Sequence, residues 1–303
     1  MARLLHQARE TAQIKLERRF GSQLQRTLSR AFVSAEVFTK KVQYSRVRSG
    51  LLNMKAIPQL TAEGNVLPES WEKSLLLLRE QGIKSRKESY TSKTGVDEIL
   101  EASMKIIVNE PLKEPRIHVG CEGLMSLADY VDEVLQGTKD AWIGRGWDYT
   151  YHQRLFEYEQ AGRRTDQIGQ IIEKLKPTSF SNRAQAITWM PWKDYEVAGP
   201  PCLQRIWCKI IDDEWLEMHT SWRSRDAYNA AFMNMYAMIL LQKMIADKIG
   251  VKMGRYVDDS DSYHVYDRNL QSLERFATAV EASKKSGRPT WMSSSSLKLF
   301  HKK

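Results

Sequence analysis

The hydrophobic and polar positions of the first half of the chain recur with a helical period. Apolar residues return every three or four positions over residues 70–80, 96–108 and 126–136, and this spacing predicts a helix in each segment. Gly82 and Gly137 follow two of these segments and are typical of the residue just past a helix end. The first half therefore predicts helices separated by short connections, including one over residues 50–64.

Alternating hydrophobicity marks several segments of the second half. Residues 184–189 and 204–211 predict two strands, and residues 215–222 predict a hairpin partner for the second, because the acidic run Asp212–Glu214 between them is typical of a turn. Residues 251–266 predict another strand. The second half therefore predicts a β-sheet.

Two further helices complete the predicted fold. Residues 228–248 are apolar almost all round, which indicates a buried central helix, and residues 268–285 predict a final helix. The fold class that follows is α+β, with a mixed β-sheet packed on a long buried helix.

The positive charge of the chain is concentrated at its start. The formal net charge is +9, and residues 1–50 hold eleven Lys and Arg but only three Asp and Glu. This predicts a basic helical N-terminal arm over residues 1–50, a catalytic domain over residues 51–290 and a mobile tail over residues 291–303. The arm could contact nucleic acid, or it could be a solvated helix that packs on the domain.

Composition excludes several classes of protein. The apolar runs are too short to cross a membrane, and the start of the chain lacks a secretory cleavage pattern, so we expect a cytoplasmic protein without membrane contact. Three cysteines without CxxC spacing argue against a disulfide framework, and six scattered histidines argue against a metal site. No glycine-rich phosphate loop is present.

The candidate chemistry begins at Cys202, which follows two prolines and precedes Arg223 by 21 residues. A nucleophilic thiol needs a positive field that lowers its pKa, and an arginine can supply that field. A guanidinium next to the hydroxyl of Ser224 suits a phosphate group. The alternatives are a structural cysteine in the core and an arginine that faces solvent or pairs with Asp226.

Three more polar residues suit a nucleotide. Asn234 is a carboxamide in an otherwise apolar helix, and it could read the edge of a pyrimidine or form a helix–helix hydrogen bond. His264 and Tyr266 alternate along a predicted strand and so share a face, where they could contact a sugar or form an ordinary polar surface.

In this order the motifs resemble the thymidylate synthase superfamily. Pro-Pro-Cys, Arg-Ser-x-Asp, an asparagine eight residues later and His-x-Tyr follow one another as in the core of that family. The resemblance covers about residues 120–270. It is closest to the archaeal-type branch in the segments YTYHQRLFEY, RAQAITW, WRSRDAYNAAFMNMYA and SDSYHVY. The pyrimidine nucleotide hydroxymethylases share these motifs.

The resemblance implies a homodimer that binds a pyrimidine nucleotide 5′-monophosphate and uses 5,10-methylenetetrahydrofolate or a related reduced pterin, without a metal. Cys202 would add to C6 of the base, and asparagine at position 234 favours uracil. The resemblance also implies that Arg223 and Ser224 bind the phosphate, with Arg183 reaching in from the other subunit. It implies sugar and substrate contacts by His264, Tyr266 and Tyr151. Asp226 and Trp147 would lie near the folate.

The sequence also departs from the family pattern. The usual paired arginines read Asn182-Arg183, and the glutamate that relays protons falls on Tyr130 if Gly137 is the glycine that ends its helix. Asp129 or Glu133, four apart on that helix, could take its place. The expected reaction is methylation of deoxyuridine monophosphate (dUMP). The alternatives are a 5-hydroxymethylase acting on dUMP, dCMP or CMP, in which water quenches the intermediate, and a non-catalytic nucleic-acid-binding homologue.

Overall fold

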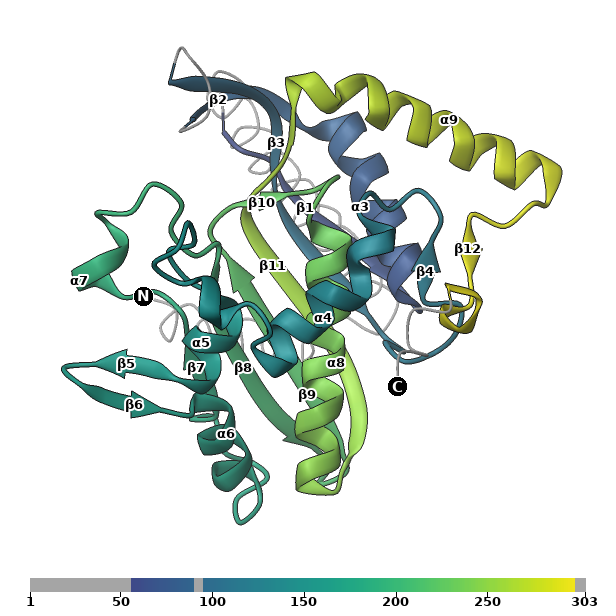
Figure 1. Ribbon diagram of the computed structural model, residues 1–303. Helices are drawn as coiled ribbons and strands as arrows, with labels where there is room; N and C mark the ends of the chain where they lie inside the picture. Colours follow the sequence, from purple (N-terminus) through teal and green to yellow (C-terminus); the bar gives the residue numbers. More distant parts are fainter. Residues whose placement is uncertain (1–55, 90–94, 298–303) are drawn as a thin grey trace, which may run out of the picture. The chain divides into compact units, whose positions relative to one another are not determined.

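A mixed eight-stranded sheet forms the centre of the computed structural model, which describes residues 56–89 and 95–297 (Figure 1). Its main strands run in the order β1-β3-β11-β9-β8-β7, with β2 on β3 and β10 on β11. β3 is parallel to β1 and antiparallel to β11, and β11 is parallel to β9. The strands are β1 (Gln59–Gly64), β2 (Ile83–Glu88), β3 (Val96–Val108), β7 (Gln185–Ile187), β8 (Leu203–Ile211), β9 (Trp215–Trp222), β10 (Arg225–Asp226) and β11 (Lys252–Tyr266).

Seven α-helices and two small strand pairs complete the part of the chain that the structure describes. The α-helices are α3 (Leu67–Gln81), α4 (Leu127–Gln136), α5 (Tyr151–Phe156), α6 (Gln167–Leu175), α7 (Pro191–Asp194), α8 (Ala231–Ile249) and α9 (Leu270–Ser286). The small pairs join β4 (Ile117–His118) with β12 (Trp291–Met292) and β5 (Tyr158–Gln160) with β6 (Arg163–Thr165). Short 3₁₀ turns are η1 (Leu124–Ser126), η2 (Asp140–Trp142), η3 (Asp267–Asn269) and η4 (Ser294–Leu297). The predicted α+β class and its mixed sheet are confirmed.

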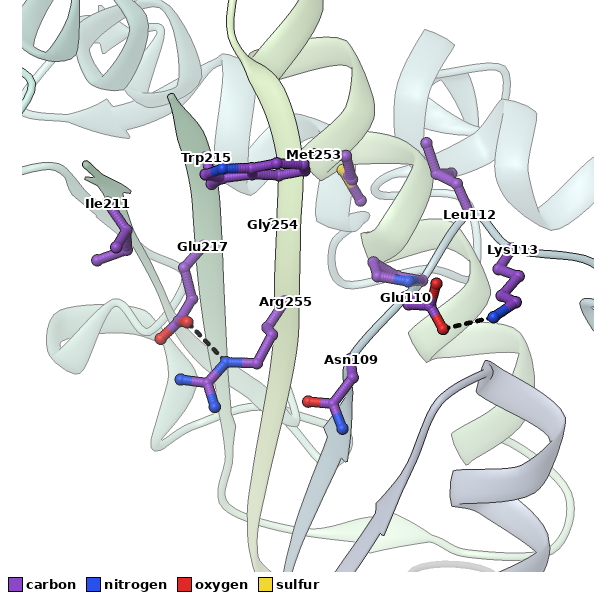
Figure 2. Close-up of a pocket in the computed structure, with 11 residues that line it drawn as sticks. Asn109, Glu110, Leu112, Lys113, Ile211, Trp215, Glu217, Met253, Gly254 and Arg255 are labelled. Carbon is purple, nitrogen blue, oxygen red and sulfur yellow. Dashed lines mark hydrogen bonds and ion pairs between the residues drawn. The ribbon is translucent and has the colours of Figure 1, made fainter. Parts of the chain in front are cut away.

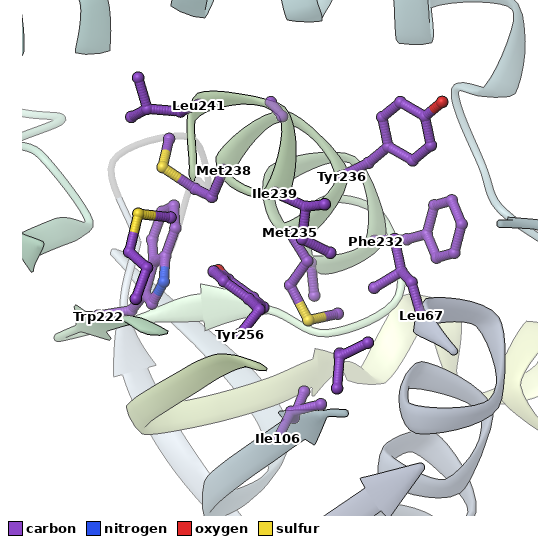
Figure 3. Packing of buried hydrophobic residues seen from close by; sticks show 14 of the residues in the cluster. Leu67, Ile106, Trp222, Phe232, Met235, Tyr236, Met238, Ile239, Leu241 and Tyr256 are labelled. Carbon is purple, nitrogen blue, oxygen red and sulfur yellow. The ribbon is translucent and has the colours of Figure 1, made fainter. Parts of the chain in front are cut away.

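The core lies between α8 and one face of the sheet (Figure 3). Phe232, Met235 and Met238 of α8 are buried, as is Tyr256 of β11. Burial of apolar side chains around most of the helix agrees with the prediction of a central helix over residues 228–248. The helix ends at Gly250, whose positive φ of 91° suits a residue without a Cβ.

The segment 96–108 is a strand and not the helix that its spacing predicted. From Ala102 onward the burial alternates, with Met104, Ile106 and Val108 also buried. Leu100, Met104 and Val108 are spaced four apart as well, which imitates one face of a helix. The helical prediction was therefore wrong, because this segment pairs with β2 in a hairpin and with β1 and β11 through non-local contacts.

The start of the domain also differs from expectation, since residues 59–64 form β1 rather than part of a connection. The remaining predictions for the described residues agree with the structure: strands near 185–187, 203–211, 215–222 and 252–266, and helices near 67–81, 127–136 and 270–286. The basic arm predicted for residues 1–50 lies outside the described residues. None of the described helices is long and apolar enough to span a membrane.

The sheet face opposite α8 is solvent-exposed. Ile206, Cys208 and Ile210 of β8 point toward the core, so their neighbours point the other way. Ile211 and Trp215 on this opposite face are 38% and 41% exposed.

Residues 291–297, the first part of the predicted tail, contact the rest of the domain. β12 pairs with β4, and the indole Nε1 of Trp291 donates to Glu72 of α3 at 3.1 Å. The backbone N–H of Ser294 donates to Glu114 at 3.0 Å. These contacts attach the end of α9 to α3.

Candidate active site

Cys202 and Arg223 lie side by side at one end of the β8–β9 hairpin. Cys202 immediately precedes β8 and Arg223 immediately follows β9, and the pairing of Leu203 with Trp222 brings the two together. The backbone N–H of Arg223 donates to the carbonyl of Cys202 at 3.0 Å. The hairpin thus brings Arg223 into direct contact with the thiol segment, although Arg223 and Cys202 are 21 residues apart in the sequence.

The guanidinium of Arg223 is held over the thiol segment. Its Nε donates to the carbonyl of Pro201 at 3.0 Å, and a terminal nitrogen donates to the carbonyl of Pro200 at 2.7 Å. Arg223 forms no ion pair with a carboxylate of the described residues. Its positive charge therefore lies beside the Pro200–Cys202 segment without a neutralising acid among the described residues, which is an environment that attracts an anion.

Ser224 and Asp226 differ in how their side chains are used. Ser224 is 7% exposed, and its hydroxyl has no hydrogen-bond partner among the described residues. Asp226 accepts from the backbone N–H groups of Tyr228 and Asn229 at 3.1 and 2.9 Å and from the Asn229 amide at 2.7 Å. Ser224 remains available for a ligand, whereas Asp226 stabilises the turn before α8.

A cavity of about 330 Å³ carries several of the predicted site residues. Glu133, Trp147 and Tyr151 line it, together with Tyr149, which the sequence analysis did not single out. Burial raises the pKa of Tyr149 to about 12, and the nearby Cys202 is the next largest contribution. The cavity therefore lies close to the thiol.

Tyr151 connects the cavity wall to the start of β8. Its phenol accepts a hydrogen bond from the backbone N–H of Leu203 at 3.4 Å, and its ring lies 5.5 Å from that of Tyr149. Burial raises the pKa of Tyr151, and Tyr149 and Cys202 raise it further. Both phenols are therefore neutral at physiological pH. The sequence could have suggested Tyr149, because it lies two residues before Tyr151, the first residue of α5.

Asn234 makes a contact that the sequence did not predict. Its Nδ2 donates to the phenol oxygen of Tyr130 on α4 at 2.5 Å. Glu133, one helical turn further along α4, lines the cavity, and burial raises the pKa of its carboxyl group. Asp129 is exposed and does not line that cavity. Of the two carboxylates proposed as substitutes for the relay glutamate, Glu133 is thus the one beside the site.

His264 and Tyr266 share one side of β11, with ring centroids 5.1 Å apart. The parallel pairing of β10 with β11 places Asp226 opposite His264. Lys87 of β2, another residue that the sequence analysis missed, donates to the Tyr266 phenol at 2.7 Å and lies 3.3 Å from Nε2 of His264. Burial, with Lys87 next, lowers the pKa of His264 to about 4, so the imidazole is neutral.

Arg183 is exposed and lies before β7. Its neighbour Asn182 accepts from the Trp207 indole at 3.1 Å and from the Lys209 ammonium at 3.0 Å. Trp207 and Lys209 belong to the sheet face opposite α8. The side chain of Arg183 contacts no described residue, Cys202 included, through a hydrogen bond or ion pair.

A larger cavity of about 700 Å³ lies elsewhere and contains none of the predicted site residues (Figure 2). Its charged side chains are already paired, Glu217 with Arg255 at 2.9 Å and Glu110 with Lys113 at 2.7 Å. Trp215 and Met253 supply apolar wall. This cavity has no group positioned for covalent chemistry, so the candidate active site is the smaller one beside Cys202.

Comparison with known proteins points to the same segment. The sequence profile of thymidylate synthase matches residues 123–287, which include Cys202, Arg223, Asn234 and His264. A protein of Methanocaldococcus jannaschii named "Putative thymidylate synthase" is 37% identical over 160 residues, which cover 51% of this chain and 69% of that protein. A protein of Methanosarcina barkeri with the same name is 28% identical over 214 residues, covering 71% of this chain and 93% of that protein.

The profile match extends over more than half of the chain, and both similar proteins come from archaea. Membership of this family implies a one-carbon transferase that acts on a nucleotide. The chain belongs to the thymidylate synthase family, in its archaeal-type branch.

Proposed function

We propose that this protein methylates C5 of dUMP to give thymidylate, with 5,10-methylenetetrahydrofolate as the one-carbon donor. The observation that carries the proposal is the contact between Arg223 and the Cys202 segment, in which an arginine without an acid partner among the described residues lies beside the segment of a partly exposed thiol. A covalent step on a phosphorylated substrate needs both groups in one place.

Cys202 is the proposed nucleophile. Its sulfur would bond to C6 of the uracil ring, and the electrons of the C5=C6 bond would move toward C4 and its oxygen, which makes C5 nucleophilic. Arg223 would contact the phosphate together with the hydroxyl of Ser224, which has no hydrogen-bond partner among the described residues.

The remaining side chains divide between the base, the sugar and the folate. Asn234 would read the base, and Tyr151 would contact the substrate beside the thiol. His264 and Tyr266 would contact the sugar, with Glu133, rather than the exposed Asp129, as the carboxyl group that handles protons.

The cavity beside Cys202 fits a planar pterin in its chemistry. Trp147 and Tyr149 offer aromatic surface, and Glu133 offers a polar group that a pterin's nitrogen atoms can bind. When bound, the reduced folate supplies the one-carbon unit and the hydride. Trp147 would hold the pterin at the cavity wall, and Asp226 would lie near the folate.

A homodimer would complete the phosphate site. Arg183 is exposed and lies beside side chains of the sheet face opposite α8, where Ile211 and Trp215 are also exposed. If two copies pack through this face, Arg183 of one copy is free to reach the phosphate in the other. We propose a catalytic domain over residues 51–290, with the basic arm as a separate element that could contact nucleic acid.

A 5-hydroxymethylase is the second candidate. Trp147 at the cavity wall is 39% exposed, so water has access to the position where the one-carbon unit would be transferred. Water would then replace hydride in the last step. The substrate could be dUMP, dCMP or CMP.

Incubation of the full chain with methylenetetrahydrofolate and each of dUMP, dCMP and CMP tests these proposals. We expect a methyl product from dUMP by mass spectrometry and loss of tritium from C5. Cys202→Ala should abolish both, whereas Cys208→Ala removes a buried thiol outside the site and should retain them. A hydroxymethyl product would replace the first proposal by the second.

A non-catalytic nucleic-acid-binding homologue predicts a different outcome. It would show no nucleotide product, and it would bind nucleic acid with a strong salt dependence that is lost on deleting residues 1–50 and unchanged in Cys202→Ala. That result would overturn both enzymatic proposals.

A further inference from the structure

Tyr130 lies where the family has its proton-relay glutamate, if Gly137 ends the corresponding helix. Gly137 does end α4 in the left-handed conformation, with φ of 67°. Tyr130 contacts Asn234 across the α4–α8 interface at 2.5 Å. The residue proposed to read the base is therefore fixed by a phenol instead of standing near a glutamate.

The hydrogen-bonding inventory of this pair leaves three groups unassigned among the described residues, one of them the second N–H of the Asn234 Nδ2. The Tyr130 oxygen accepts from Nδ2 of Asn234, so the single phenolic proton must point elsewhere. The Oδ1 of Asn234 accepts no hydrogen bond from a described residue. The pair therefore presents the O–H donor of Tyr130 and, on Asn234, one C=O acceptor together with the remaining N–H donor.

The Tyr130 donor and the Asn234 acceptor match the edge of uracil. Uracil offers an N3–H donor beside an oxygen on C4, whereas neutral cytosine offers an N3 acceptor beside an amino donor. Oδ1 of Asn234 suits N3–H, and the Tyr130 proton suits the C4 oxygen. Cytosine would face mismatched partners at both positions, so it should bind more weakly than uracil.

The C4 oxygen is also where negative charge develops. When the Cys202 sulfur bonds to C6, the C5=C6 electron pair shifts into the ring and the C4 oxygen becomes an enolate. No atom leaves at this step, and the phenolic proton stays on Tyr130 while donating to that oxygen. Burial raises the pKa of Tyr130, and Glu133 raises it further, so the phenol keeps its proton at neutral pH.

We propose that Tyr130 is a catalytic residue that donates a hydrogen bond to the C4 oxygen of uracil and, with Asn234, selects uracil over cytosine. The inference rests on the proposed function, because it assigns a role within the same nucleotide site. It differs from the family pattern in using a neutral phenol in direct contact with the base.

Kinetics of Tyr130→Phe test the catalytic role. We expect kcat with dUMP to fall about 100-fold, as when a donor to a developing oxyanion is removed, and KM to stay within about threefold. A merely structural role would instead raise KM and lower the unfolding temperature. Tyr228→Phe is the matched control, because it removes a buried phenol that lines a separate cavity. A kcat for Tyr130→Phe within about threefold of the wild type would overturn the proposal.

Calorimetry of the wild type tests the specificity without any variant. We expect dUMP to bind at least about tenfold more tightly than dCMP, since a site built for one hydrogen-bonding pattern rejects the reverse pattern. Equal binding of the two nucleotides would overturn the proposal. A wild type that neither binds nor converts dUMP contradicts the proposed function, whereas an active wild type with an equally active Tyr130→Phe contradicts only the role of Tyr130.

Discussion

Arg223 and Arg225 are two residues apart, yet their surroundings are opposite. Arg225 is 2% exposed and makes two hydrogen bonds to Asp258 at 3.0 and 2.9 Å, with its guanidinium 3.8 Å from the Trp222 ring centroid. Arg223 is partly exposed, and among the described residues its guanidinium donates to the carbonyls of Pro200 and Pro201 and to no carboxylate. One charge is neutralised inside the fold, and the other is not.

This contrast distinguishes an arginine that stabilises the fold, Arg225, from one that is available to bind substrate, Arg223. The Arg225–Asp258 pair ties β10 to β11 and so fixes the turn from which Arg223 and Ser224 emerge. A buried charge must be paired, because desolvation is costly, whereas a charge left to bind substrate must lack a permanent acid. The partner, more than the residue type, distinguishes a structural arginine from a functional one.

The largest effect should come from breaking the buried pair. Arg225→Met leaves the Asp258 carboxylate unpaired in the core, and we expect the free energy of unfolding to fall by about 3–5 kcal/mol in urea titrations. The double variant Arg225→Met/Asp258→Leu removes both charges but leaves the buried donors of Thr220, Trp222 and Tyr256 without this acceptor, so it should recover only part of that loss. A loss below about 1 kcal/mol in the single variant would mean that Arg225 is not the anchor described above.

A smaller effect, on activity and not on stability, should follow from Arg223→Ala. Loss of a charge-assisted phosphate contact should lower kcat/KM for dUMP about 100-fold, mainly through KM, while the free energy of unfolding changes by less than about 1 kcal/mol. Deoxyuridine, which lacks the phosphate, separates the two roles of this arginine. An equal loss with dUMP and deoxyuridine would show that Arg223 acts by holding the Cys202 segment and not by binding phosphate.

The sequence predicted the part of the fold whose signals are local. The β8–β9 hairpin and α8 follow from alternation, an acidic turn and a continuous apolar stretch, and the hairpin then places Cys202 beside Arg223. Strand β3 was mistaken for a helix because its pairing with β1 and β11 is non-local, and its apolar residues fit both periods.

Only those residues of the site that belong to recognisable motifs could be predicted from the sequence. Lys87 reaches His264 and Tyr266 through tertiary packing, which no spacing in the chain records. The different roles of Arg223 and Arg225 could not be predicted either, because Asp258, the ion-pair partner of Arg225, is 33 residues away in the sequence. Motifs thus identify residue types, and the fold decides which of them remain free to act.

Ser224→Ala should give the smallest effect and the finest test of the same contrast. Its hydroxyl has no partner among the described residues, so its removal leaves no polar group unpaired, and the free energy of unfolding should change by less than about 0.5 kcal/mol. Loss of one hydrogen bond to phosphate, about 1 kcal/mol, should raise KM for dUMP roughly fivefold and leave deoxyuridine unaffected.

Ser70→Ala is the matched control for that substitution. The Ser70 hydroxyl is fully buried and donates to the carbonyl of Ile107 at 2.8 Å, so its loss leaves a β3 carbonyl without this partner. We expect about 1–2 kcal/mol of lost stability and an unchanged KM. If Ser224→Ala behaves like Ser70→Ala, with lost stability and normal KM, then Ser224 belongs with Arg225 to the scaffold, and only Arg223 of this turn faces the phosphate.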